Sequence, residues 1–162
     1  MLLILEKGGL LAMTVMIAAP VTGTVTPLTE VPDPVFAKAL VGPGAAIDPG
    51  DAATLTVTAP VSGTLTSLKP HAFVISHRPD QGVLVHLGID TVHLKGAGFT
   101  LHAEAGQQVE AGDEIIVWDL AAAREAEKPL VVPVVVLGAD VGDLTVAEAG
   151  PIYAGDTLIR VG

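Results

Sequence analysis

The chain contains no cysteine among its 162 residues. This absence excludes disulfide bonds, a thiol nucleophile and a thiolate metal site. Chains without disulfides are typical of reducing compartments, so we expect a cytoplasmic protein.

Basic residues are also scarce. Eight lysines and arginines stand against 18 aspartates and glutamates, which gives a formal net charge of −10. Because nucleic acids and anionic membrane surfaces are themselves negative, we expect binding to neither. The charge either speeds encounters with basic protein partners or simply keeps the domain in solution.

The chain has no long apolar run. Its apolar opening, residues 1–16, is interrupted by polar residues and glycines at 6–9 and has no basic start. It is therefore too short and broken for a membrane span and is a poor signal peptide. Since Met13 serves equally well as a start, we interpret residues 1–12 as a disordered or non-native leader. Residues 13–162 then form a single domain, with no membrane insertion.

Aromatic residues make up only 3% of the chain. Val and Thr are frequent instead, and 18 glycines and 12 prolines are distributed along it. Two sequence motifs occur twice in similar form. The first is APVTGTVT at 19–26, which is similar to APVSGTLT at 59–66. The second is AGQQVEAGDEII from Ala105, which is similar to AGPIYAGDTLI from Ala149. Branched residues and frequent turns favour short strands. We predict an all-β, antiparallel sandwich or distorted barrel with an internal repeat and at most one or two short helical turns.

Eleven strands are predicted, and the helical turns are placed at 34–39 and 120–128. The strands are expected at 15–18, 23–28, 45–47, 55–59, 63–68, 72–77, 82–87, 99–102, 114–119, 131–137 and 157–161. Asp113 and Asp156 each follow a glycine and are interpreted as turn formers.

Two histidines are candidates for chemistry. His86 lies in the apolar alternation GVLVHLGI, and His71 lies in KPHAF beside the neighbouring predicted strand. A histidine in such a strand is often only a hydrogen-bonded core residue. Two imidazoles that meet on one face, however, combine a nucleophilic nitrogen with a donor for a bound anion.

The segment HLGIDTVHLKGAGF, residues 86–99, resembles the active-site signature of glucose-type enzyme IIA of the bacterial phosphoenolpyruvate-dependent sugar phosphotransferase system. The likeness extends to VPDPVFA at 31–37, to the first APV repeat, to HAF at 71–73 and to AGQQVEAGDEIIVWDL. It covers roughly residues 16–162.

This resemblance implies a phosphocarrier. His86 would accept the phosphoryl group on Nε2 from the histidine phosphocarrier protein and pass it to a sugar-specific enzyme IIB or IIBC. The Gly88 carbonyl would hold Nδ1–H, and His71 would donate to the phosphoryl oxygens. Asp33 and Asp90 would meet basic partner side chains.

The resemblance also implies an apolar docking surface around the histidines and requires no cofactor. The surface would be formed by Val35, Phe36, Leu40 and Val41. No metal would be resident, although His71 and His86 could share a transient zinc with a partner.

The chain departs from the family pattern at two places. Lys69 stands where a threonine commonly orients the supporting histidine, and we interpret it as solvated, although its charge could also attract the phosphoryl group. His93 stands where an acidic residue is common, and we interpret His93, His77 and His102 as surface residues without a task.

Three other functions remain open from the residues alone. APVSGTL resembles a biotinyl or lipoyl carrier module, but neither Lys69 nor Lys95 has the flanking residues that such modules use. Paired histidines also suit a hydrolase or metalloenzyme, but a third ligand is not evident. The third alternative is a non-catalytic β-sandwich interaction domain.

Overall fold

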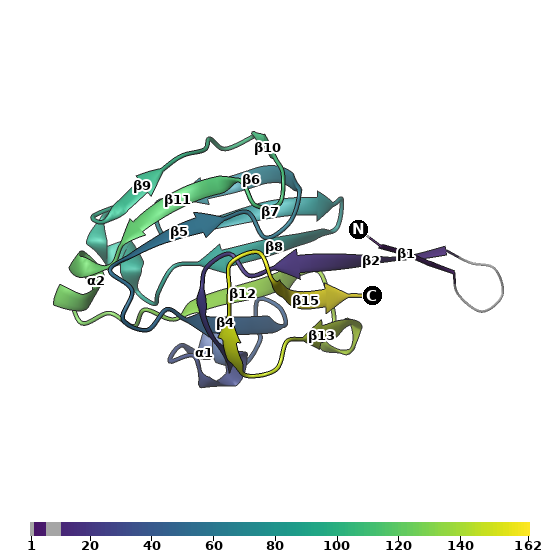
Figure 1. The fold of residues 1–162 in the computed structure, drawn as a ribbon, viewed down its shortest axis with the longest axis horizontal. Helices are drawn as coiled ribbons and strands as arrows, with labels where there is room; N and C mark the ends of the chain where they lie inside the picture. Colours follow the sequence, from purple (N-terminus) through teal and green to yellow (C-terminus); the bar gives the residue numbers. More distant parts are fainter. Residues whose placement is uncertain (1, 6–10) are drawn as a thin grey trace.

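The computed structural model describes residues 2–5 and 11–162. It is built around an eight-stranded sheet in the order β10-β6-β7-β8-β12-β4-β3-β14 (Figure 1). Its strands are β3 (Gly23–Pro27), β4 (Gly44–Asp48), β6 (Gly63–Lys69), β7 (Ala72–Arg78), β8 (Gln81–His86), β10 (Gln108–Val109), β12 (Val132–Leu137) and β14 (Gly150–Ile152). All pairs between them are antiparallel.

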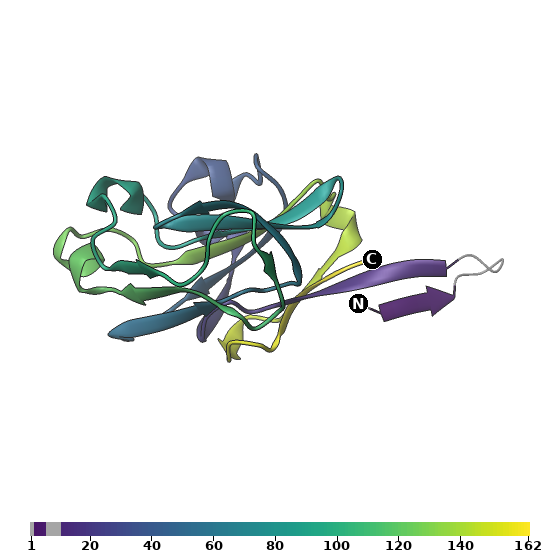
Figure 2. The ribbon, with the colours of Figure 1, turned by 90° about the horizontal axis from the view of Figure 1, so that it is seen from above.

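Two smaller sheets complete the sandwich seen from above in Figure 2. One has the order β5-β11-β9, with β5 (Thr54–Thr58), β11 (Glu114–Asp119) and β9 (Phe99–Leu101). The other has the order β1-β2-β15-β13, with β1 (Leu2–Leu5), β2 (Leu11–Ala18), β13 (Leu144–Val146) and β15 (Thr157–Val161).

The core lies between these layers. Alternate residues of the strands point into it, so Val83 and Val85 of β8 are fully buried there, as is Phe73 of β7. Trp118 of β11 enters the same core from the opposite layer, and its ring stacks on Phe99 with 5.5 Å between centroids. The in-and-out alternation therefore leaves every second residue of β7 and β8 on the outer face of the large sheet.

A helical segment covers part of that outer face. It consists of the 3₁₀ turn η1 (Leu28–Glu30) and the helix α1 (Pro34–Ala37). The Asp33 carboxylate caps α1 by accepting from the Val35 N–H, and proline at the first position suits the start of a helix. The segment buries a second apolar cluster against the sheet, made of Leu28, Val31, Phe36, Ala46, Ile89 and Val135.

The predicted all-β sandwich is confirmed. Helix α1 matches the turn predicted at 34–39, and α2 (Ala121–Glu125) is shorter than the predicted 120–128. Within the described residues the structure adds three 3₁₀ turns, which are η1, η2 (Thr91–Leu94) and η3 (Val141–Asp143). It also adds the short strands β1, β10, β13 and β14, which were not predicted.

Strands β1 and β2 form a hairpin that projects from the body (Figure 1). Part of the predicted leader, residues 2–5 and 11–12, lies in this hairpin, while residues 1 and 6–10 lie outside the described residues. That the leader is dispensable stays a prediction. No helix in the described ranges is long and apolar enough to cross a membrane.

Candidate functional site

His86 is the last residue of β8 and lies on the outer face of the large sheet. It is half-buried, because the ring of Phe36 from α1 packs against it with 5.2 Å between ring centroids. The segment that covers the sheet thus also forms one wall of the site.

His71 lies in the two-residue turn that joins β6 to β7. Its backbone carbonyl accepts from the Leu87 N–H at 2.7 Å, which places it directly beside the end of β8. The two imidazole rings meet edge to face at 74°, with centroids 5.2 Å apart. The structure therefore brings the two predicted histidines together on one face.

Gly88 fixes the tautomer of His86. Nδ1 of the His86 ring lies 2.6 Å from the Gly88 carbonyl oxygen. Since a carbonyl can only accept, Nδ1 carries the proton and donates, which leaves a lone pair on Nε2. This contact is the one that the family resemblance implied.

The backbone at Gly88 has no space for a side chain. Its φ of +78° is unfavourable for other residues, and an added Cβ would lie 2.6 Å from a Thr91 methyl and 2.8 Å from the Pro129 carbonyl oxygen. Thr91 is buried, and its hydroxyl donates to the Leu87 carbonyl at 2.6 Å. Buried Thr91, which the sequence reading did not single out, thus holds the loop that presents the Gly88 carbonyl.

Burial is the main influence on the charge of both rings. It lowers the pKa of His86 below its ordinary 6.5, against smaller raising effects of the Gly88 hydrogen bond and of the Asp33 and Asp90 carboxylates. Burial also lowers the pKa of His71, helped by the neighbouring His86 and by the positive charge of Lys69. Burial thus favours the neutral form of both rings, which is the form in which an imidazole can act as a nucleophile.

The two predicted acidic residues flank His86 from different elements. Asp33 comes from the start of α1, and Asp90 precedes η2 in a left-handed conformation with a φ of +59°. In Figure 2, α1 and η2 lie on the same side of the molecule. Asp90 is exposed, whereas Asp33 is partly buried and already engaged in capping α1.

Three of the four residues predicted to form a docking surface are exposed, and the fourth is buried. Val35, Leu40 and Val41 are 42%, 68% and 39% exposed, respectively. Phe36, by contrast, is only 6% exposed, because its ring lies in the outer apolar cluster and against His86. Its ring therefore supports the His86 ring from below the surface.

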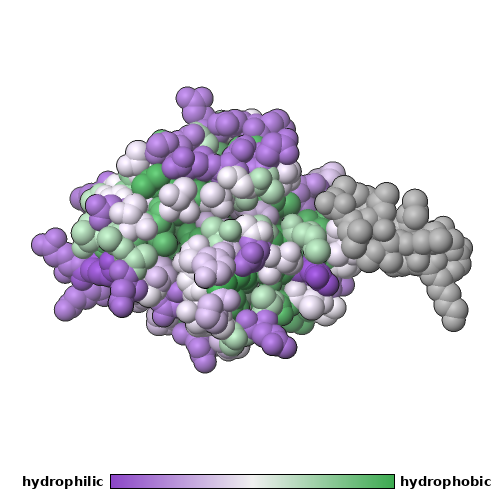
Figure 3. All heavy atoms as spheres, viewed as in Figure 1, coloured by the Kyte–Doolittle hydropathy of each residue, from purple (hydrophilic) through white to green (hydrophobic). Residues whose placement is uncertain are grey.

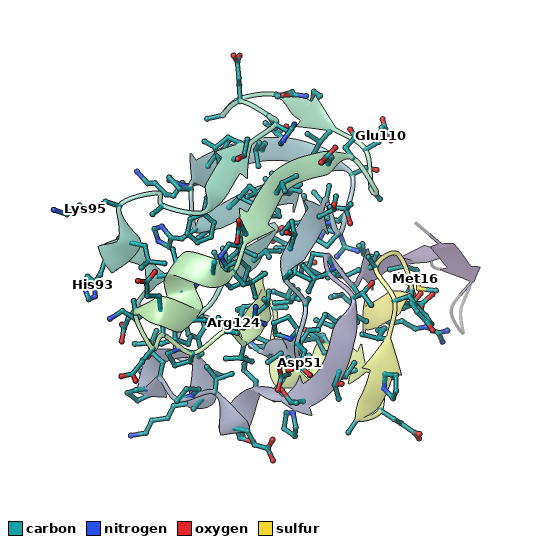
Figure 4. All side chains as sticks on the ribbon, turned by 60° about the vertical axis from the view of Figure 1, so that its left-hand side comes forward. Met16, Asp51, His93, Lys95, Glu110 and Arg124 are labelled. Carbon is teal, nitrogen blue, oxygen red and sulfur yellow. The ribbon has the colours of Figure 1, made fainter. Side chains whose placement is uncertain are left out.

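The remaining histidines lie away from the pair. His93 and His102 are exposed as predicted, and Figure 4 shows His93 and Lys95 pointing outward from η2. His77 corrects the sequence reading, because it is half-buried on β7 and its Nε2–H donates to Gln81 Oε1 at 2.8 Å. Its position two residues after buried Ile75 in an alternating strand was the available signal.

No group of three or more metal-binding side chains occurs in the part of the chain that the structure describes. His71 and His86 can supply two of the four ligands that zinc prefers, and the rest would have to come from another molecule. A zinc ion shared with a partner stays a prediction.

Comparison with known proteins assigns the family. The family model of the phosphoenolpyruvate-dependent sugar phosphotransferase system, EIIA 1, matches residues 15–141. The structure of the glucose permease IIA from Mycoplasma capricolum superimposes with a TM-score of 0.85 at 31% identity, covering 93% of this chain and 97% of that one. The chain belongs to the EIIA 1 family and is thus a component of a sugar phosphotransferase system.

Two curated relatives come from Corynebacterium glutamicum. The glucose-specific EIIBCA component is 41% identical over 150 residues, which cover 91% of this chain and 22% of that protein. The mannose-specific EIIBCA component is 42% identical over 148 residues, which cover 90% of this chain and 21% of that protein. The chain therefore spans about a fifth of the length of these relatives.

Proposed function

We propose that the protein carries a phosphoryl group on Nε2 of His86, accepting it from the histidine phosphocarrier protein and handing it to a sugar-specific enzyme IIB or IIBC in the cytoplasm. The observation that carries this proposal is the hydrogen bond from Nδ1 of His86 to the Gly88 carbonyl. It holds the proton on one ring nitrogen and leaves the other free to attack phosphorus.

The transfer is balanced without an external base. As Nε2 bonds to phosphorus, the bond from phosphorus to the donor's ring nitrogen breaks, and that nitrogen keeps the electron pair. The His86 ring retains its Nδ1 proton and gains positive charge, which the Gly88 carbonyl dipole stabilises at 2.6 Å. Positioning and electrostatics then do most of the catalysis, as in other phosphoryl transfers.

His71 has the position for a helper. Its ring stands edge to face with that of His86, so an N–H of His71 can donate to a phosphoryl oxygen as charge develops there. Exposed Val35, Leu40 and Val41 offer partners an apolar surface, and Asp90 beside it offers a charge for their basic residues. A small surface of this kind suits rapid release of each partner.

The relatives' names support the proposed acceptor. Both are EIIBCA components, in which IIA-type, IIB-type and IIC-type parts share one protein. One is named glucose-specific and the other mannose-specific, although this chain is almost equally identical to both. These two identities therefore do not assign a sugar to this chain.

The direct test is phosphorylation with phosphoenolpyruvate and the general phosphotransfer proteins. Intact mass is measured at alkaline pH, because a phosphohistidine is a phosphoramidate that survives alkali and is lost in acid. We expect one phosphoryl group on the unaltered chain and none on His86→Gln. His102→Gln, which changes an exposed histidine, is the matched control. A label on a serine, threonine or aspartate would refute the proposal.

A further inference from the structure

A row of three residues crosses three strands at the site. Lys69 at the end of β6 lies directly opposite Ala72 of β7, and Ala72 lies directly opposite His86 of β8. Residues directly opposite each other in antiparallel strands project to the same face of the sheet. Lys69, Ala72 and His86 therefore share the outer face.

The burial pattern agrees with this register. Phe73 and Leu68 form the neighbouring cross-strand pair; Phe73 is in the inner core, and Leu68 packs against that core. Lys69 is exposed, whereas Ala72 is 8% exposed and places only a methyl group between the lysine and the histidine. Two strand spacings of about 4.8 Å separate Lys69 from His86, a span that the four-carbon stem of a lysine largely covers.

The positive charge of Lys69 acts on the histidine pair. It lowers the pKa of His71, the ring that meets His86 edge to face. The chain has only eight lysines and arginines against 18 acidic residues. The carboxylates of Asp33 and Asp90 act on His86, so a positive charge near the histidine pair counters the negative surroundings of an incoming phosphoryl group.

We propose that the Lys69 ammonium group contacts the phosphoryl group carried on Nε2 of His86 and stabilises its two negative charges. This inference rests on the proposed function and adds a residue to it. The chemistry is unchanged: the nitrogen–phosphorus bond forms as the bond to the donor breaks, and Lys69 neither gains nor loses a proton.

The decisive variant is Lys69→Met, which keeps most of the stem and removes the charge. Arg160→Met is the matched control, because Arg160 is exposed on β15, in a different sheet, and its loss changes the net charge equally. We expect Lys69→Met to reduce the equilibrium constant for phosphorylation by the phosphorylated donor about tenfold, a size usual for a charge-assisted contact. Lys69→Arg should stay within about twofold, and the defect of Lys69→Met should shrink at high salt.

A second measurement separates contact from structure. The phosphorus resonance of the phosphorylated chain reports the last ionisation of the phosphoryl group, whose pKa a nearby ammonium lowers. That pKa should rise in Lys69→Met and not in Arg160→Met, with melting temperatures of both variants unchanged. Equal behaviour of the two variants, with the unaltered chain labelled on His86, would overturn the role of Lys69 alone. Absence of label on His86 would overturn the proposed function as well.

Discussion

The β7–β8 hairpin carries a histidine at each end, and the two are arranged in opposite ways. At its open end, Nδ1 of His86 donates to the Gly88 backbone carbonyl and Nε2 is left with a lone pair. At its closed end, Nε2 of His77 donates to the Gln81 side chain, and its Nδ1 is buried without a partner among the described residues. Burial lowers the pKa of both rings.

A lowered pKa is therefore shared by the two rings, and the features that distinguish His86, the proposed carrier, are others. His86 has its proton held by a rigid backbone group, a second imidazole 5.2 Å away between centroids and an exposed apolar surface beside it. His77 instead lines a cavity of about 250 Å³ together with Val15, Met16, Val61, Ser62 and Ala111. Met16 is marked in Figure 4, on the side of the molecule away from His93.

The polar groups near the two ends of the β7–β8 hairpin also differ in their hydrogen-bond partners. Figure 3 shows hydrophilic residues over β10 and the adjoining loops at the top of the view, as well as at its lower left and bottom. Near the His77 cavity, the Ser62 hydroxyl donates to Glu110 and accepts from the Ala111 N–H. The Ser62 hydroxyl at this end thus bonds to its own polar neighbours, whereas Nε2 of His86 keeps a lone pair for an incoming group.

The largest expected difference between the two ends is kinetic. His71→Gln removes a donor aimed at the phosphoryl group and should slow transfer by roughly a hundred- to a thousandfold, while His86 still becomes labelled. His77→Gln should leave the rate within about twofold, because His77 has no contact with the pair. Rapid-quench labelling measures both. If His71→Gln blocks labelling and His86→Gln does not, the nucleophile and its helper are reversed.

The second test disturbs the backbone that presents the Gly88 carbonyl to His86. Gly88→Ala combines a positive φ with contacts of 2.6 and 2.8 Å to Thr91 and Pro129, so it should destabilise the fold by about 2 kcal/mol and lower the melting temperature by about 4–8 °C. Gly106→Ala is the matched control, because Gly106 has a φ of +90° and nothing within 4 Å of an added Cβ. Equal losses in the two variants would mean that the crowding at Gly88 is unimportant.

The sequence was sufficient to predict the main strands, because the alternation of apolar and polar residues indicates which side of each strand faces the core. It was insufficient for β10, β13 and β14, whose two or three residues are too few to show a period. The 3₁₀ turn at Thr91–Leu94 is flanked by two residues in the left-handed conformation, Asp90 and Lys95. No local sequence pattern predicts that conformation at either residue.

The site was predictable to a similar degree. A resemblance spread along most of the chain pointed to His71, His86 and Gly88, and the structure places all three together. The burial of Phe36 and His77 was not predictable, because it depends on packing against segments that are distant in the sequence. The row from Lys69 to His86 depends on strand register, which a bulge between Leu65 and Ser67 shifts.

The third test varies pH. Because burial lowers the pKa of His86 below 6.5, the rate of acceptance should be constant above pH 6.5 and fall only as pH drops through the lowered pKa. Stability should behave likewise: the unfolded rings take up protons at higher pH than the folded ones, so unfolding becomes easier as pH falls below 6.5. Urea unfolding between about pH 5 and 8 measures this slope, which His77→Gln should reduce without moving the pH–rate profile. A profile that shifts in His77→Gln would show that the two ends are coupled.

The smallest effect is expected from the projecting hairpin that adjoins the His77 end. Strand β1 pairs with residues 11–14 of β2, whereas β15 pairs with residues 15–18, so removal of residues 1–12 deletes no pairing between β2 and the body. We expect the melting temperature to change by less than about 2 °C and the proton titration of His77 to be unaltered. Removal through Ala18 is the contrasting control, because it also takes away Val15 and Ile17, which are 3% and 0% exposed in the core. A large loss of stability in the shorter truncation would show that the leader is part of the domain. A shifted His77 titration would show that the leader also affects the cavity lined by Val15, Met16 and His77.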